Sequence, residues 1–79
     1  MSELPKKVLS TLLITGAQSP DRALSSLDLA NKLGLGEALS VAALEELRRG
    51  GYVKSSLRNG VQHFYLSATG IIAASSTYS

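Results

Sequence analysis

An Asn59-Gly60 pair lies between two segments of alternating polar and apolar residues, 52–58 and 61–66. Both residues of this pair tolerate the positive φ angles that a two-residue type I′ turn needs. The pattern therefore predicts a β-hairpin, and the length of the turn sets its register. On the mostly apolar face, the expected pairs are Val53 with Leu66, Ser55 with Phe64, and Leu57 with Gln62.

The opposite face of the predicted hairpin is mostly polar or basic. Its expected pairs are Lys54 with Tyr65, Ser56 with His63, and Arg58 with Val61. Lys54, Arg58 and His63, with Tyr65 nearby, suit contact with phosphate groups. Arg58 stands beside the turn, a position that suits insertion into a minor groove. The alternative is that these side chains only keep the hairpin solvated.

Before the hairpin, apolar residues recur every three or four positions, which predicts helices. The first helix is expected from near Pro5 to Gly16, because proline suits a first turn and glycine ends a helix. The second follows Ser25, whose spacing to Asp28 matches a capping box, and it closes at Gly34.

A third helix is expected from Gly36 to Arg49, and the Gly-Gly pair that follows ends it. At about 100° per residue, one arc of this helix faces the core and another faces outward. The expected core arc holds Leu39, Ala43, Leu44 and Leu47. The expected outward arc holds Ala38, Val41, Ala42, Glu45 and Arg49, with Glu37 and Arg48 at its flank.

A short fourth helix is expected after Ser67, whose side chain can cap it. This helix would hold Ile71, Ile72 and Ala74, and a frayed tail is expected over 75–79. The 79 residues are enough for a single domain, expected over 1–79. The predicted fold is α+β, with a three-helix core, a β-hairpin and a short C-terminal helix.

The composition argues against several kinds of chemistry. The chain has no cysteine, which removes disulfides, thiolate zinc sites and cysteine nucleophiles. His63 is its only histidine, and we expect no metal because no cluster of ligands accompanies it. The sequence has no carboxylate pair in an expected cleft, no serine elbow and no glycine-rich phosphate loop. We therefore expect a binding protein without a cofactor, not an enzyme.

The apolar runs are far shorter than the ~20 residues that a membrane-spanning helix needs. The first residues do not resemble a signal peptide, so we expect a soluble, cytoplasmic protein. Eight Lys and Arg against six Asp and Glu give a mild net charge of +2. The position of the charges therefore matters more than their sum. Cations expected to extend a positive surface from the hairpin are Lys6, Lys7, Lys32, Arg48 and Arg49.

Three stretches, at 29–35, 44–53 and 66–70, together resemble the winged helix-turn-helix domain of small MarR-, PadR- and ArsR-type regulators. In LANKLGL, Ala30 permits a close helix crossing and Gly34 makes the turn. LEELRRGGYV resembles the end of the third helix and the entry into the hairpin, or wing. LSATG stands where these families often have Leu-Thr-x-x-Gly. The resemblance covers nearly the whole chain.

The resemblance implies a DNA-binding protein that regulates transcription, with double-stranded DNA as its partner. In such domains the third helix enters the major groove and the wing lies beside it. The first two turns of this third helix lack Arg, Lys, Asn and Gln. We therefore expect phosphate contacts with limited direct base readout. The candidate DNA-binding residues are Glu37, Ala38, Val41, Ala42, Arg48, Arg49, Lys54, Arg58, His63 and Tyr65.

Other binding functions stay open. The outward stripe of Ala38, Val41 and Ala42 could instead receive a protein partner, with this chain as an interaction module or a small subunit of a complex. RNA could bind the same basic hairpin, with Tyr65 and His63 stacking on bases. The resemblance also implies a homodimer through the first and last helices, which would place two third helices on successive half-sites.

Overall fold

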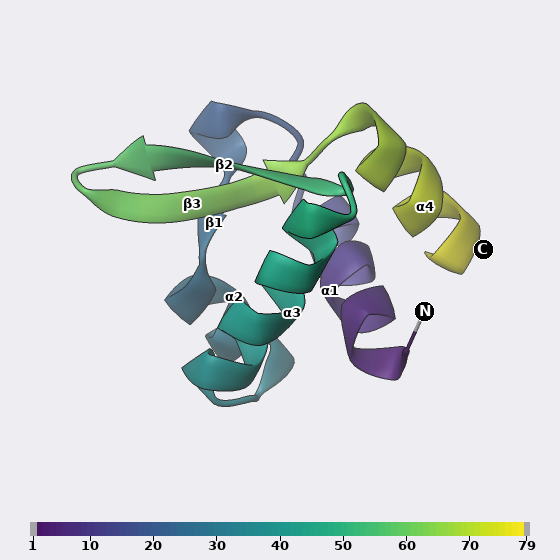
Figure 1. The fold of residues 1–79 in the computed structure, drawn as a ribbon, viewed down its shortest axis with the longest axis horizontal. Coiled ribbons are helices and arrows are strands. Elements are labelled where there is room, and N and C mark those ends of the chain that lie inside the picture. Colours follow the sequence, from purple (N-terminus) through teal and green to yellow (C-terminus); the bar gives the residue numbers. More distant parts are fainter. Residues whose placement is uncertain (1, 79) are drawn as a thin grey trace.

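The computed structural model describes residues 2–78, and it describes side chains as far as residue 76. Three helices pack into a bundle, a β-hairpin extends from one end of it, and the last helix lies against the first (Figure 1). In chain order the elements are α1 (Glu3–Ile14), the 3-10 turn η1 (Pro20–Arg22), β1 (Leu24–Ser25), α2 (Ser26–Leu33), α3 (Glu37–Arg49), β2 (Val53–Arg58), β3 (Val61–Leu66) and α4 (Ala68–Tyr78).

The predicted hairpin is present in the predicted register. Val53 pairs with Leu66 at its base, and Arg58 pairs with Val61 beside the turn. Asn59 has a φ of 53° and Gly60 a φ of 77°, the left-handed conformations that a type I′ turn needs. The short-range turn chemistry therefore places every side chain of β2 and β3 on its expected face.

A third strand, β1, is absent from the sequence-based prediction. Its two residues, Leu24 and Ser25, pair antiparallel with Phe64 and His63 of β3. Two residues are too few to show an alternating pattern, so only tertiary pairing reveals this strand. The strand order is β1-β3-β2, which makes β2 an edge of the sheet and β3 its centre.

The predicted start and stop of α2 are confirmed. The Ser25 hydroxyl accepts a hydrogen bond of 3.1 Å from the backbone N–H of Asp28, as a helix N-cap does. Gly34 follows the helix with a φ of 70°, a conformation that costs glycine little. These two residues set the length of α2 and the turn toward α3.

The core face of α3 differs from the prediction at one position, where Ser40 takes the place of Leu39. Ala43, Leu44 and Leu47 are buried as expected, but Leu39 is 55% exposed and Ser40 is fully buried. Residues 40, 43, 44 and 47 follow the i, i+3, i+4, i+7 spacing of a single helix face, and Leu39 lies beside it. The Ser40 hydroxyl donates to the Gly36 carbonyl at 3.3 Å, so its burial leaves no polar group unsatisfied.

Ser67 joins the hairpin to α4, as the sequence predicted for a cap. Its hydroxyl accepts a hydrogen bond of 3.0 Å from the Gly70 N–H and donates one of 2.6 Å to the Gly51 carbonyl. The helix then continues to Tyr78, where the prediction had a frayed tail from Ser75. The last residue of that tail lies outside the described residues.

Gly70 gives the first testable prediction. A Cβ at this position would lie 1.8 Å from the Tyr52 carbonyl oxygen, so Gly70→Ala forces backbone apart at the base of the hairpin. We expect the variant to lose about 3 kcal/mol of unfolding free energy, measured by urea denaturation. Thr69→Ala changes an exposed neighbour in the same turn and should stay close to wild type. Equal stability of the two variants would contradict this packing.

Candidate nucleic-acid interface

The outward side of α3 is a surface of small and apolar side chains, as predicted. Ala38 and Ala42 are exposed, and Val41 is 39% exposed. Glu37 begins the helix, and its carboxylate accepts a hydrogen bond of 3.0 Å from the Ser26 hydroxyl of α2. This side of α3 therefore presents small apolar side chains and few hydrogen-bond donors.

Charge on α3 gathers in its last two turns. The Arg48 guanidinium donates to the half-buried Glu45 carboxylate at 2.7 Å. This hydrogen bond, with the charge of Glu45, raises the pKa of Arg48 above its ordinary value. Arg49 is exposed, and no ion pair engages it in the part of the chain that the structure describes. Arg49 is therefore the free cation of this helix.

The hairpin carries Lys54, Arg58, His63 and Tyr65 on one face, which the register confirms. Val53, Phe64 and Leu66 on the opposite face are buried in the core. Because the core lies beneath that face, the basic face points away from the helices. Lys54 is exposed on β2, an edge strand of the sheet.

Arg58 is engaged in a contact that the sequence did not predict. Its guanidinium donates a hydrogen bond of 2.7 Å to the Pro20 carbonyl of η1. The side chain thus connects the hairpin tip to a segment that lies before β1 in the chain. Arg58 is exposed, and this hydrogen bond connects its side chain to η1.

His63 and Tyr65 lie on the central strand and are half-buried. The His63 Nδ1 atom is 2.9 Å from the Val61 carbonyl oxygen. Because a carbonyl oxygen can only accept, this contact is a hydrogen bond in the tautomer that has the hydrogen on Nδ1. These two rings are therefore less accessible than Lys54.

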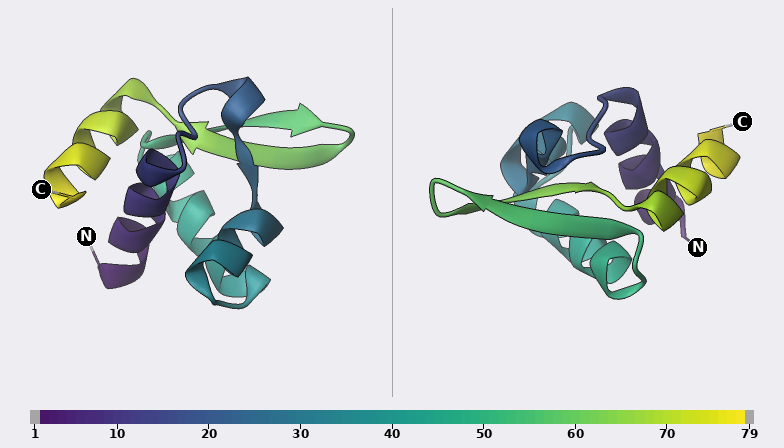
Figure 2. Two further views of the ribbon diagram at one scale, coloured as in Figure 1. Left: turned by 180° about the vertical axis from the view of Figure 1, so that it is seen from behind. Right: turned by 90° about the horizontal axis from the view of Figure 1, so that it is seen from above.

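The elements of the candidate interface share one side of the molecule. Seen from above, α3 and β2 lie on one side, and α1 and η1 lie on the other (Figure 2). A separate groove between α1 and α2 is lined by Lys6, Lys7 and Lys32. The prediction that these lysines extend the positive surface of the hairpin is therefore wrong. Arg49 and Lys54 remain as exposed cations on the α3 and β2 elements.

An apolar area at the start of α3 was not predicted from the sequence. Leu39 lines a groove there with Leu4, Leu33 and Leu35. Leu35 is 36% exposed and Leu39 is 55% exposed. The sequence held one indication that Leu39 is exposed. Position 40, not position 39, has the i, i+3, i+7 spacing to Ala43 and Leu47 that places residues on one helix face.

Among the described residues, no group of three His, Asp or Glu side chains could hold a metal ion. Within the same part of the chain, no helix is both long and apolar enough to cross a bilayer.

The contact of Arg58 with η1 gives a prediction about Asp21. A hydrogen bond from the Ser19 side chain is the main cause that lowers the pKa of Asp21 below its ordinary 3.8, and the nearby charges of Arg22 and Arg58 contribute. Arg58→Ala removes one of these charges, so the pKa of Asp21 should rise toward its ordinary value. NMR titration of the Asp21 carboxyl measures this change, with Arg49→Ala as the control.

The sign of the pH effect follows from the direction of the shift. Because folding lowers the pKa of Asp21, its contribution to stability is present above the unfolded-state pKa and is lost as pH falls through the folded-state pKa. An Asp21 pKa that is the same in Arg58→Ala and wild type would show that the Arg58 charge does not help to lower it.

Comparison with known proteins relates this geometry to solved structures. No protein-family model matches the chain, and no curated protein sequence matches it. MepR, a transcription regulator of the Staphylococcus aureus multidrug efflux pump MepA, superposes with a TM-score of 0.85 at 15% identity, over 99% of this chain and 56% of its own. The adhesin competence repressor AdcR of Streptococcus pyogenes gives a TM-score of 0.81 at 18% identity, over 99% and 55%.

A third similar structure is a mutant of ZitR from Lactococcus lactis, with a TM-score of 0.76 at 19% identity, over 99% of this chain and 54% of its own. MepR has also been solved in complex with DNA, and that structure superposes with a TM-score of 0.83. The chain spans about half the length of each of these proteins. The described residues thus have the winged helix-turn-helix fold that these regulators contain, with α3 as its third helix and the β2–β3 hairpin as its wing.

Proposed function

We propose that this protein binds double-stranded DNA through the exposed side of α3 and the adjoining edge strand β2, and that it regulates transcription. The observation that carries the proposal is that α3 and β2 lie on one side of the molecule (Figure 2). Each of these elements carries an exposed cation, Arg49 on α3 and Lys54 on β2. The fold adds support, because a protein that shares it has been solved with DNA.

Phosphate contact in this proposal comes from the cations at the end of α3 and on β2. Arg49 and Lys54 are exposed, and neither takes part in an ion pair within the described side chains. Arg48 forms an ion pair with Glu45, so it contributes less to phosphate binding. Arg58 holds the hairpin tip against η1 and keeps further N–H donors for a phosphate oxygen.

Base contact in this proposal is mainly apolar. Ala38, Val41 and Ala42 can touch thymine methyl groups, and Glu37 can accept a hydrogen bond from a cytosine amine. None of these side chains makes the two-atom contact by which arginine or asparagine reads one base. We therefore infer that DNA shape and deformability supply much of the specificity.

A two-fold dimer is part of the proposal. Ile14 at the end of α1 is 63% exposed, and Ile72 on α4 is 69% exposed. Because α1 and α4 pack side by side, these residues offer apolar contact area to a second copy. A dimer built in this way would present two α3 helices to one duplex.

Salt dependence tests the proposed phosphate contacts. The slope of log affinity against log salt changes by about 0.9 for each phosphate contact. Lys54→Ala and Arg49→Ala should each weaken binding of a short duplex and flatten this slope by about 0.9, measured by fluorescence anisotropy over a range of KCl concentrations.

The control for this experiment is Thr69→Asp, which lowers the net charge by the same amount at an exposed position on α4. It should leave the slope at the wild-type value. Wild-type slopes in both cation variants would remove the α3–β2 side from the binding mechanism.

A protein-interaction module is the second candidate function. The exposed leucines at the start of α3 favour it, because they extend the apolar surface that Val41 and the alanines form. Such a surface suits the apolar face of another protein chain. In this alternative α3 would not enter a DNA groove.

Val41→Lys separates the two candidates. If α3 lies against DNA, the new cation should strengthen duplex binding and steepen the salt slope by about 0.9. If the α3 face serves a protein partner, duplex affinity and slope should both stay at the wild-type values. Val41→Ala, which changes size and adds no charge, is the matched control. The same anisotropy measurement decides between them.

A further inference from the structure

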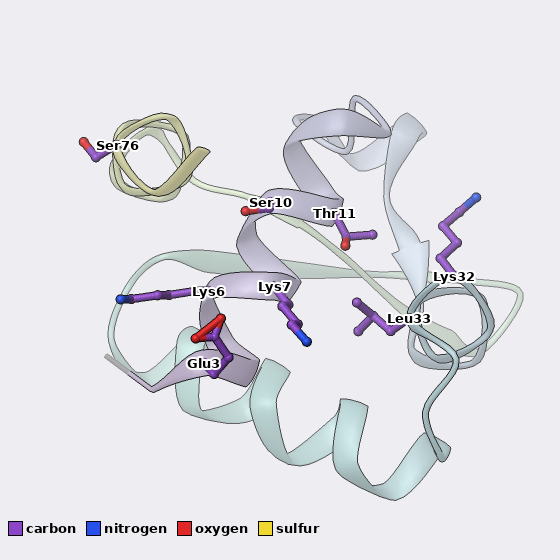
Figure 3. Close-up of a pocket in the computed structure, with 8 residues that line it drawn as sticks. All are labelled: Glu3, Lys6, Lys7, Ser10, Thr11, Lys32, Leu33 and Ser76. Atoms are coloured by element: carbon purple, nitrogen blue, oxygen red, sulfur yellow. The ribbon is translucent and has the colours of Figure 1, made fainter. Parts of the chain in front are cut away.

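An open groove of about 760 Å³ lies between α1, α2 and the end of α4 (Figure 3). Its lining includes Lys6 and Lys7 from α1 and Lys32 from the last turn of α2. These are three of the four lysines of the chain. The hydroxyl-bearing residues Ser10 and Thr11 of α1 line the same groove.

The groove is positively charged. Glu3 is the one acidic residue in its lining, against three lysines. Among the side chains that the structure describes, the one ion pair joins Arg48 and Glu45, so no carboxylate lies within ion-pair distance of these lysines. All three are exposed, which leaves their ammonium groups accessible to an anion.

The groove opens away from the proposed DNA-binding side. Seen from behind, α1 and α2 are nearest the viewer and α3 lies beyond them (Figure 2). A rigid duplex that lies against the outward side of α3 would therefore not reach Lys6, Lys7 and Lys32 at the same time. A ligand bound in this groove would therefore be separate from the duplex that lies against α3.

The spread of the lysines indicates the form of that ligand. Figure 3 shows the side chains of Lys6, Lys7 and Lys32 extending in different directions, and they do not converge on one point. Converging donors would suit one small anion, whereas spread cations suit a chain of phosphates. Leu33 is the one apolar side chain of the lining, so the groove offers little to an aromatic or aliphatic molecule.

We propose that the Lys6, Lys7 and Lys32 groove is a second phosphate-binding surface that takes the backbone of another DNA segment. The choice of DNA over a free phosphate compound rests on the proposed function. With two such surfaces, one molecule contacts two duplex segments and connects them. The groove reads no sequence, because lysines that contact only phosphates carry no base information.

The test is an NMR titration of the labelled full chain with a short DNA duplex. Amide signals of residues 6–11 and 32–33 report on the groove, and those of 38–49 and 54 report on the α3–β2 side. We expect both sets to shift with duplex concentration. Lys6→Ala, Lys7→Ala and Lys32→Ala combined should abolish the groove shifts and leave the α3–β2 shifts. The salt slope of duplex binding should flatten by about 0.9 for each phosphate that the groove no longer holds.

The control replaces the same three lysines by arginine, which keeps the charge and should keep the groove shifts. Because all three positions are exposed, we expect the substitutions to leave the fold intact, and the spectrum of each unbound variant checks this. A parallel titration with inorganic tripolyphosphate identifies the source of the phosphate. We expect the duplex to shift the groove signals at a much lower phosphate concentration than tripolyphosphate does.

Each result separates the inference from the proposed function. Duplex shifts at α3–β2 without groove shifts overturn the second surface and leave the proposed function standing. Groove shifts alone overturn the α3–β2 interface and support the groove. Groove shifts that survive in the triple-alanine variant, or that tripolyphosphate matches at equal phosphate concentration, overturn the assignment to a DNA backbone.

Discussion

Ser67 lies where α3, the hairpin and α4 meet, and its hydrogen bonds connect all three. Its hydroxyl reaches the Gly51 carbonyl after α3 and the Gly70 N–H in α4, and its backbone N–H donates to the Tyr52 carbonyl at 3.0 Å. Nearby, the Leu66 N–H donates to the Ala17 carbonyl after α1 at 2.8 Å. These hydrogen bonds set the angle between the hairpin and the helices, so the position of Lys54 relative to α3 depends on them.

The small net charge of +2 hides an uneven distribution. On α3, Glu45 offsets Arg48, and Glu37 stands at the end that would enter a groove. Three lysines gather instead on the far side of the bundle, around a groove with one acidic residue. Because exposed charges act over about a Debye length, such local groupings govern contact with a polyanion more than the total does. Both proposed phosphate surfaces follow from this grouping.

The sequence predicted the parts of the fold that depend on neighbours in the chain. Asn59-Gly60 predicted the turn and the full hairpin register, and Ser25 and Gly34 predicted the limits of α2. It failed where the answer depends on distant residues. β1 exists because β3 is there to pair with it, and Leu39 is exposed because the packing of α3 turns Ser40 into the core. The candidate site shows the same difference between local and distant contacts. The outward residues of α3 were predicted, but the hydrogen bond from Arg58 to the Pro20 carbonyl of η1 was not.

By itself, the sequence determined the four α-helices, the two strands of the hairpin, and which side chains share a face of that hairpin. Those properties follow from backbone sterics and from periods of about two and 3.6 residues, which neighbouring residues enforce. Only the tertiary structure decided that Lys6, Lys7 and Lys32 surround one groove and that Pro20 accepts a hydrogen bond from Arg58. The physical reason is that such arrangements depend on how whole elements pack together, and packing is a property of the assembled core.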